Sequence, residues 1–208
     1  MIVERLPDSH DALKPTIRTV GNHVLDVQNW VKTDHVSASF DIHHDGSSIY
    51  LIYYVLEDHV RAVNTQFNSA VWEDSCVEFF FSLKEDAGNY YNFEFNSIGT
   101  VLGAYGRNRN VRKWLSSSEL KKIEVLPSLG RKPFDDIKEP TAWSLRIKIP
   151  VSTLSFSDIS DISGRDGHAN FYKCGDNLMT PHFLSWKPVL HPTPDFHLSR
   201  YFGQLSFL

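Results

Sequence analysis

Short stretches of alternating or continuous hydrophobic residues recur along the chain, whereas long helical periodicity is scarce. The run Val36–Ile42 alternates between apolar and polar residues, and the run Ser48–Leu56 is almost entirely apolar or aromatic. Alternation is typical of a half-buried strand, and a short apolar run is typical of a strand buried on both faces. The same criteria predict strands at 74–83, 90–96, 100–106, 122–126, 142–149, 169–174, 182–186 and 204–207.

About ten short strands separated by turn residues predict an all-β fold, a two-sheet antiparallel β-sandwich of jelly-roll type. Pro150 ends one of these strands, and a helical turn is expected over 151–154. The 208 residues contain no internal repeat and no low-complexity linker, so residues 1–208 are expected to form a single domain.

Two of the predicted strands are joined by the polar loop 84–89 (KEDAGN) and are expected to form a hairpin. The odd-numbered apolar residues of both strands face the core, which leaves Glu78 and Phe80 on the opposite face. A symmetric hairpin would place Glu78 near Asn96 and Phe80 near Glu94.

This hairpin carries a polar patch of Glu78, Asn92, Glu94 and Asn96 just after Trp72 in sequence. Carboxylates and amides bind sugar hydroxyls, and an aromatic face covers the C–H surface of a pyranose ring. The patch therefore favours a sugar site. The alternative is a solvated strand face beside a core tryptophan.

Composition and net charge favour some classes of binding partner and disfavour others. Aromatic residues reach 13% of the chain, with 14 Phe, 8 Tyr and 5 Trp, and they supply both strand formers and flat binding surfaces. A formal net charge of -4 disfavours nucleic acid as a partner, and the basic stretch 107–113 is interpreted as a solvated loop. No run approaches the ~18 apolar residues that a membrane span needs, so no membrane partner is expected.

The N-terminal residues MIVERLPDSH contain no apolar core of a signal peptide. The compartment stays open: periplasmic or extracellular if a signal was trimmed, and cytoplasmic otherwise.

Three segments resemble carbohydrate-binding module family nine. They are 71–81 (VWEDSCVEFFF), 90–106 (YYNFEFNSIGTVLGAYG) and 170–207, which ends in FGQLSF. The resemblance covers about Ser37 to Leu208 and is greatest to stand-alone members of gut bacteria, with the DOMON-like sandwiches as broader relatives. It implies non-catalytic binding of a mono- or oligosaccharide, in the service of polysaccharide or oligosaccharide utilisation.

The same resemblance implies a set of binding residues. Trp72 and Trp186 match two tryptophans that hold a sugar end between their rings, and Glu78 and Asn96 match residues that bond its hydroxyls. Glu94 stands where some members have an arginine, so an acceptor replaces a donor and the sugar preference is open.

Positive charge for the site could come instead from Lys173 or Arg107. Among the other tryptophans, Trp143 alternates with core residues and is expected to be buried, while Trp30 and Trp114 have no context beyond surface or packing roles.

Two alternative functions remain. Glu78 and Glu94 could be the carboxylate pair of a glycoside hydrolase, although no other catalytic signature is present. Some DOMON-like relatives hold haem through Met and His, and Met179 with His182 is the nearest such pair in this sequence.

Metal-binding motifs are weak. Cys76 and Cys174 are far apart without CxxC spacing, so buried free thiols or a disulfide are both open. The ten histidines show no zinc-binding spacing, so no metal and no cofactor are expected. Calcium is the alternative, because some family members carry structural calcium and residues 157–176 contain four aspartates, but their spacing is not that of an EF-hand.

Overall fold

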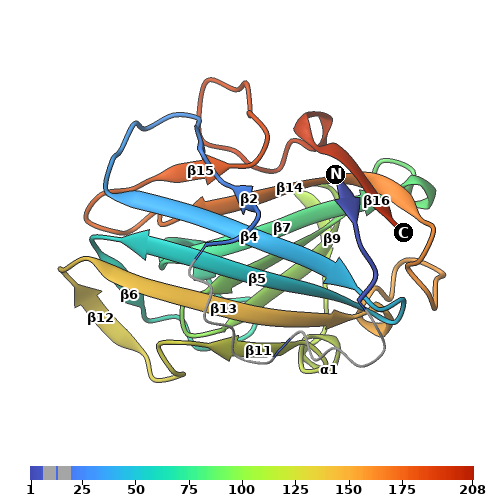
Figure 1. Cartoon of the computed structure of the whole chain (residues 1–208), viewed down its shortest axis with the longest axis horizontal. Coiled ribbons are helices and arrows are strands. Elements are labelled where there is room, and N and C mark those ends of the chain that lie inside the picture. Colours follow the sequence, from blue (N-terminus) through green and yellow to red (C-terminus); the bar gives the residue numbers. More distant parts are fainter. Residues whose placement is uncertain (7–12, 14–19) are drawn as a thin grey trace.

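The chain folds into two β-sheets packed face to face, as a computed structural model that describes residues 1–6, 13 and 20–208 shows (Figure 1). The strands β4, β5 and β13 of one sheet lie in front of β7, β9 and β14 of the other. All pairs of strands but one, β1 with β16, are antiparallel. The predicted antiparallel β-sandwich is confirmed.

The larger sheet has nine strands, in the order β1-β16-β14-β7-β8-β9-β10, with β15 and β3 paired beyond β14. Their bounds are β1 (Ile2–Val3), β3 (Val27–Gln28), β7 (Cys76–Leu83), β8 (Tyr90–Asn96), β9 (Val101–Asn108), β10 (Val111–Trp114), β14 (Asp166–Cys174), β15 (Phe183–Ser185) and β16 (Gly203–Phe207).

The smaller sheet has five strands, in the order β11-β13-β5-β4-β2. Their bounds are β2 (His23–Val24), β4 (Val36–His44), β5 (Ser48–Glu57), β11 (Glu124–Pro127) and β13 (Thr141–Pro150). A separate pair joins β6 (Val60–Ala62) to β12 (Phe134–Ile137).

Helical segments are short. The α-helix α1 covers Ser117–Leu120, and the 3-10 turns are η1 (Val71–Glu73), η2 (Lys84–Asp86), η3 (Val151–Thr153) and η4 (Ser199–Tyr201). None of the helices in the described residues is long and apolar enough to cross a membrane.

The main core lies between the two sheets and is built by strand alternation. The odd-numbered residues of β7 and β8, among them Phe79 and Phe93, point into it and are fully buried. Trp143 on β13 joins them at 3% exposure, as predicted. Each buried aromatic contributes about 2 to 3 kcal/mol of burial free energy, so this inner face dominates the stability of the sandwich.

A second apolar cluster covers part of the outer face of the nine-stranded sheet. Phe80, Tyr90 and Tyr172 point outward from β7, β8 and β14, and Phe196 and Phe202 of the C-terminal segment pack on them. The rings of Tyr172 and Phe196 stack with centroids 4.0 Å apart. Phe80 is therefore buried beneath the C-terminal segment, and the face predicted to be an open polar patch is partly roofed.

The register of the β7–β8 hairpin differs from the prediction by two residues. Glu78 lies opposite Glu94, Phe80 opposite Asn92, and Cys76 opposite Asn96. The cause is the loop, since η2 takes up Lys84–Asp86 and the chain then turns through Ala87 with a positive φ of 50°. The strand bounds at 90–96 are confirmed, but the expected neighbours Glu78 and Asn96 are wrong.

Candidate functional site

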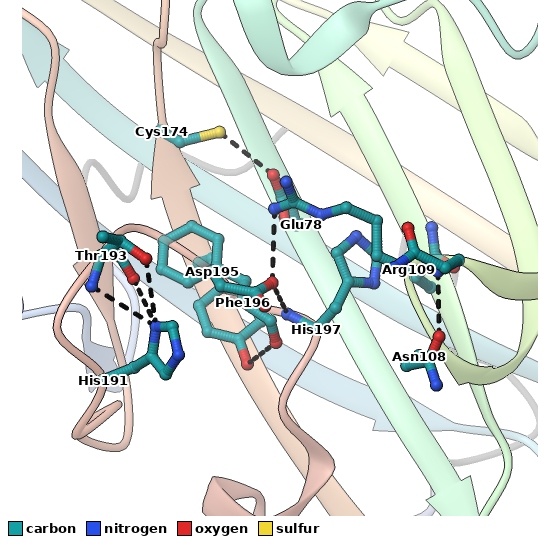
Figure 2. A network of polar contacts seen from close by, with 12 residues as sticks. Glu78, Asn108, Arg109, Cys174, His191, Thr193, Asp195, Phe196 and His197 are labelled. Atoms are coloured by element: carbon teal, nitrogen blue, oxygen red, sulfur yellow. Dashed lines mark hydrogen bonds and ion pairs between the residues drawn. The ribbon is translucent and has the colours of Figure 1, made fainter.

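A cavity of about 130 Å³ opens on the outer face of the nine-stranded sheet, beside the second apolar cluster. Segments far apart in sequence converge on it, including β7, β8, β14 and the C-terminal segment. Figure 2 shows Glu78, Cys174 and Asp195, which come from three of these segments. The lining residues of the cavity are Trp30, Trp72, Glu78, Glu94, Arg109, Arg112, Cys174, Asp176, Phe183, Pro194, Asp195, Phe196 and His197.

Two carboxyl groups form the floor of this cavity. Glu78 and Glu94 are directly paired across β7 and β8, and each is 3% exposed. Burial and then the charge of Glu94 raise the pKa of Glu78 well above its usual value. Burial likewise raises the pKa of Glu94 to about 7, against the opposing effect of Arg112. The floor therefore offers both hydrogen-bond donors and acceptors near neutral pH.

Two arginines from the β9–β10 hairpin face these acids. Arg112 places Nη1 3.9 Å from Glu94 Oε1, and Arg109 donates to Asp195 Oδ1 at 3.3 Å. A bulge between Val111 and Arg112 shifts the register of β10, and such bulges re-aim a side chain. Gly106 makes the close approach possible, because a Cβ there would lie 2.2 Å from the Val111 carbonyl oxygen.

The hydrogen bonds of His197 fix its neutral form. Arg112 Nη1 lies 3.3 Å from His197 Nε2, and an arginine can only donate, so Nε2 accepts. The other nitrogen, Nδ1, then carries the proton and donates to the Tyr90 hydroxyl at 2.8 Å. Burial, followed by the charges of the two arginines, lowers the pKa of His197 well below its usual value.

Aromatic rings form the walls. Trp72 belongs to η1, and its carbonyl oxygen accepts from the backbone of Asp176 at 3.1 Å. Trp30 follows β3, and its indole Nε1 donates to the His191 carbonyl oxygen at 2.6 Å. The ring of Phe183 meets Trp30 edge-on at 5.7 Å. Partly exposed indoles above buried carboxyls and guanidinium groups suit a ligand with an apolar face and polar edges.

Asn96 lies outside this cavity and is fully buried. Its Nδ2 donates to the Asn64 carbonyl oxygen at 2.8 Å and to Asp74 Oδ2 at 2.9 Å, and its Oδ1 accepts from the Thr100 backbone at 2.8 Å. These three hydrogen bonds tie the Asn96 side chain to the neighbouring loops.

Trp186 also lies away from the cavity. Its backbone N–H donates to the Phe171 carbonyl oxygen at 3.0 Å, and its ring packs against the main core rather than against Trp72. The structure brings Trp72, Glu78 and Glu94 together, and it supplies Trp30 as the second indole. Sequence reasoning missed Trp30 because its neighbours in the cavity come from distant segments.

The positive charge comes from residues that the sequence analysis assigned to a solvated loop. Arg109 and Arg112 line the cavity, whereas Arg107 is exposed on β9. Lys173 is fully buried elsewhere, with Nζ 2.9 Å from Glu57 Oε2 and 2.7 Å from His182 Nε2. Side chains alternate between the two faces of a strand, and this alternation within the basic stretch 107–113 could have identified Arg112 as the residue that faces the site.

The groups considered for metal or haem are spread out. Asp161 and Asp166 bond to their own surroundings, Ser163 for the first and Lys84 with Ser206 for the second. Met179 is 56% exposed, while His182 is buried against Lys173. Across residues 1–6, 13 and 20–208, the one group of three or more His, Cys, Asp or Glu side chains placed to share an ion is Cys76, Glu78 and Cys174.

Comparisons with known proteins point in one direction. The profile described as carbohydrate-binding family 9 matches residues 12–207. A solved structure of a candidate carbohydrate-binding protein from Bacteroides uniformis ATCC 8492 is similar with a TM-score of 0.84 and 42% identity, over 89% of this chain and 85% of that one. No protein with a curated description matches the chain.

Two more distant structures share the fold. A carbohydrate binding module of family 9 from Caldicellulosiruptor kristjanssonii, in complex with glucose, has a TM-score of 0.60 and 12% identity, over 100% of this chain and 95% of that one. A structure of such a module from the same organism, in complex with cellotriose, has a TM-score of 0.61 and 11% identity, over 100% and 92%.

Proposed function

The chain belongs to carbohydrate-binding family 9, and we propose that it binds a mono- or oligosaccharide, without catalysis, in the cavity lined by Trp72 and Trp30. The ligand would serve polysaccharide or oligosaccharide utilisation. The observation that carries the proposal is the arrangement itself: partly exposed indoles form walls above a buried polar floor.

Each part of the cavity has a role in this proposal. The indoles of Trp72 and Trp30 would cover the C–H surface of a sugar ring. Glu78 and Glu94 would accept from or donate to its hydroxyls, and Arg112 would supply a fixed donor on the same floor. Arg112 would thus supply the hydrogen-bond donor that some family members have as an arginine at the position of Glu94. Because these groups are held by strands and by one another, little ordering is needed on binding.

The placement of the two carboxyl groups favours binding over glycoside hydrolysis. Glu78 and Glu94 are neighbours on one floor, on adjacent strands of a single sheet. Hydrolysis by two carboxylates needs them on either side of the scissile bond, about 5 to 9.5 Å apart with the substrate between them. A sugar lying on this floor would have both groups on the same side.

Calorimetric titration with glucose and with cellotriose tests the proposal. The wild type is expected to bind at least one of them, and Trp72→Ala is expected to weaken that binding by roughly five- to thirtyfold, since a stacked ring contributes about 1 to 2 kcal/mol. Thermal unfolding checks that the variant is folded. Unchanged affinity in a folded Trp72→Ala protein, or turnover of aryl glycosides by the wild type, would contradict the proposal.

A further inference from the structure

The two cysteines of the sequence meet beside the floor of the cavity. Cys76 on β7 and Cys174 on β14 are directly opposed across these adjacent antiparallel strands, so both side chains point to the outer face of the sheet. Glu78 is the next residue of β7 on that face. Cys174 and Glu78 line the cavity, and Cys76 lies beside them, fully buried.

We propose that Cys76, Glu78 and Cys174 bind zinc, or another thiophilic divalent cation, at the floor of this cavity. Their ligand atoms, two Sγ and one carboxylate oxygen, all lie within 4.8 Å of one another. Figure 2 shows the sulfur of Cys174 directed at the carboxyl group of Glu78, with Sγ 3.0 Å from Oε1.

These distances suit a tetrahedral ion with small side-chain adjustments. Zinc binds sulfur at about 2.3 Å and carboxylate oxygen at about 2.0 to 2.2 Å, which separates the ligands of a tetrahedral site by roughly 3.5 to 3.8 Å. The three atoms would shift by no more than about 1 Å to reach these separations. Short side chains on paired strands can make such a shift by rotation about χ1 and χ2, without moving the sheet.

The chemistry of the three groups selects the class of ion. Two thiolates and one carboxylate favour zinc over calcium or magnesium, which prefer oxygen ligands alone. Burial and then Glu78 raise the pKa of the Cys76 thiol, and the hydrogen bond with Cys76, then burial and Glu78, raise the pKa of the Cys174 thiol. The charge that offsets the two thiolates would therefore have to come from the bound cation itself, which displaces the thiol protons.

A set of three protein ligands leaves the fourth position of a tetrahedral ion free. Because Cys174 and Glu78 line the cavity, that position would face the space proposed for the sugar, and the ion could enter from there. Both cysteines are free thiols in the structure, as such a site requires.

Cobalt and zinc titrations of the reduced, chelator-treated protein test the site. One equivalent of Co²⁺ per chain is expected, with tetrahedral visible bands and a thiolate-to-cobalt charge-transfer band that Zn²⁺ abolishes. Cys76→Ser with Cys174→Ser should remove the charge-transfer band and weaken zinc binding at least roughly a hundredfold, more than the loss of an outer-shell partner. Asp161→Asn, in an exposed loop that contains no proposed ligand, should behave as the wild type.

A thiolate band in the wild-type spectrum already shows ligation by Cys76 or Cys174, the only two cysteines of the chain, so this part of the test does not depend on the folding of the double variant. A reduced wild type that binds no metal, or whose cobalt complex lacks the thiolate band, would overturn the proposal. So would zinc binding that survives in the double variant. The zinc result does not depend on whether any sugar binds.

Discussion

The indole of Trp186 meets the ring of Phe171 edge-on, with ring centroids 5.8 Å apart and planes at 82°. Phe171 is fully buried, and a Cβ added at Gly203 would lie 2.7 Å from the Trp186 ring, so the inner side of the indole is closely packed. Lys187 covers the ring with its ammonium group 4.1 Å from the centroid. In this structure Trp186 therefore packs against the main core from a partly exposed position.

Replacing Trp186 tests whether its indole contributes to the stability of the fold or to sugar binding. Trp186→Ala is expected to lower the free energy of unfolding by about 2 to 4 kcal/mol, because it leaves a cavity against Phe171. Chemical denaturation measures this loss. Sugar affinity of the folded variant, measured by calorimetry, should stay within about twofold of the wild type, and a large loss of affinity would instead place Trp186 in the site.

Trp30 is expected to show the opposite behaviour. Trp30→Ala removes one wall of the cavity, so sugar affinity should fall by roughly tenfold or more. Trp30→Phe keeps an aromatic face but loses the bond to the His191 carbonyl oxygen, and it should fall in between. Titration of the three proteins with the sugar that the wild type binds tests this order. Equal affinities would show that Trp72 acts without a partner ring.

The buried pair Lys173 and Glu57 should be sensitive to the loss of one member. Their side chains are 0% and 2% exposed with Nζ and Oε2 2.9 Å apart, and Glu57 Oε1 accepts from Trp143 at 2.7 Å. Lys173→Met would leave a buried carboxylate without its cation, which costs about 3 to 5 kcal/mol.

Denaturation of a double-mutant cycle measures the coupling. Combining Lys173→Met with Glu57→Gln should recover much of the stability that Lys173→Met loses, because no unpaired charge remains. Additive losses in the two single variants would argue against the pairing.

His182 should make the fold less stable in acid. Its Nε2 accepts from Lys173, so its Nδ1 carries the proton and donates to the Thr180 carbonyl oxygen at 3.1 Å. Burial, and then the charge of Lys173, lower the pKa of His182 to about 2. Below the unfolded value of 6.5, the unfolded chain takes up a proton that the folded chain does not. Stability is thus present above pH ~6.5 and is lost as the pH falls, by about 1.4 kcal/mol per pH unit.

Urea denaturation at pH 7 and pH 5 checks this sign. His182→Gln should lose roughly 2 kcal/mol less than the wild type between these two pH values. His168→Gln, an exposed position on β14, should keep the wild-type difference. If His182→Gln also keeps it, His182 is protonated in the folded state.

Strand alternation predicted the strands well because it depends only on the order of apolar and polar residues within each strand. The run 90–96 coincides with β8, and 48–56 and 142–149 fall within β5 and β13. Two-residue strands such as β2 and β3 were not predicted, since they form by pairing with distant partners and carry no pattern of their own. The hairpin register was missed because it depends on the backbone of the loop 84–89, including the left-handed Ala87.

The candidate site was only half predictable for the same reason. Trp72, Glu78 and Glu94 lie within two neighbouring segments, where alternation decides which side chains share a face. Trp30 and Phe196 reach the cavity through tertiary packing alone. The family pattern suggested Trp186, but its side chain follows the inner face of the sheet.

The sheet order also bears on when the cavity appears during synthesis. β14 pairs with β7 although the strands β8 to β13 lie between them in sequence, and the roof over Phe80 comes from Phe196 and Phe202. Contacts of such high contact order form slowly, and they cannot form before the last strands have left the ribosome. A nascent chain that ends before Phe183 would carry the carboxyl floor without the part of the lining from Phe183 to His197, so sugar binding would report that this segment has folded into place.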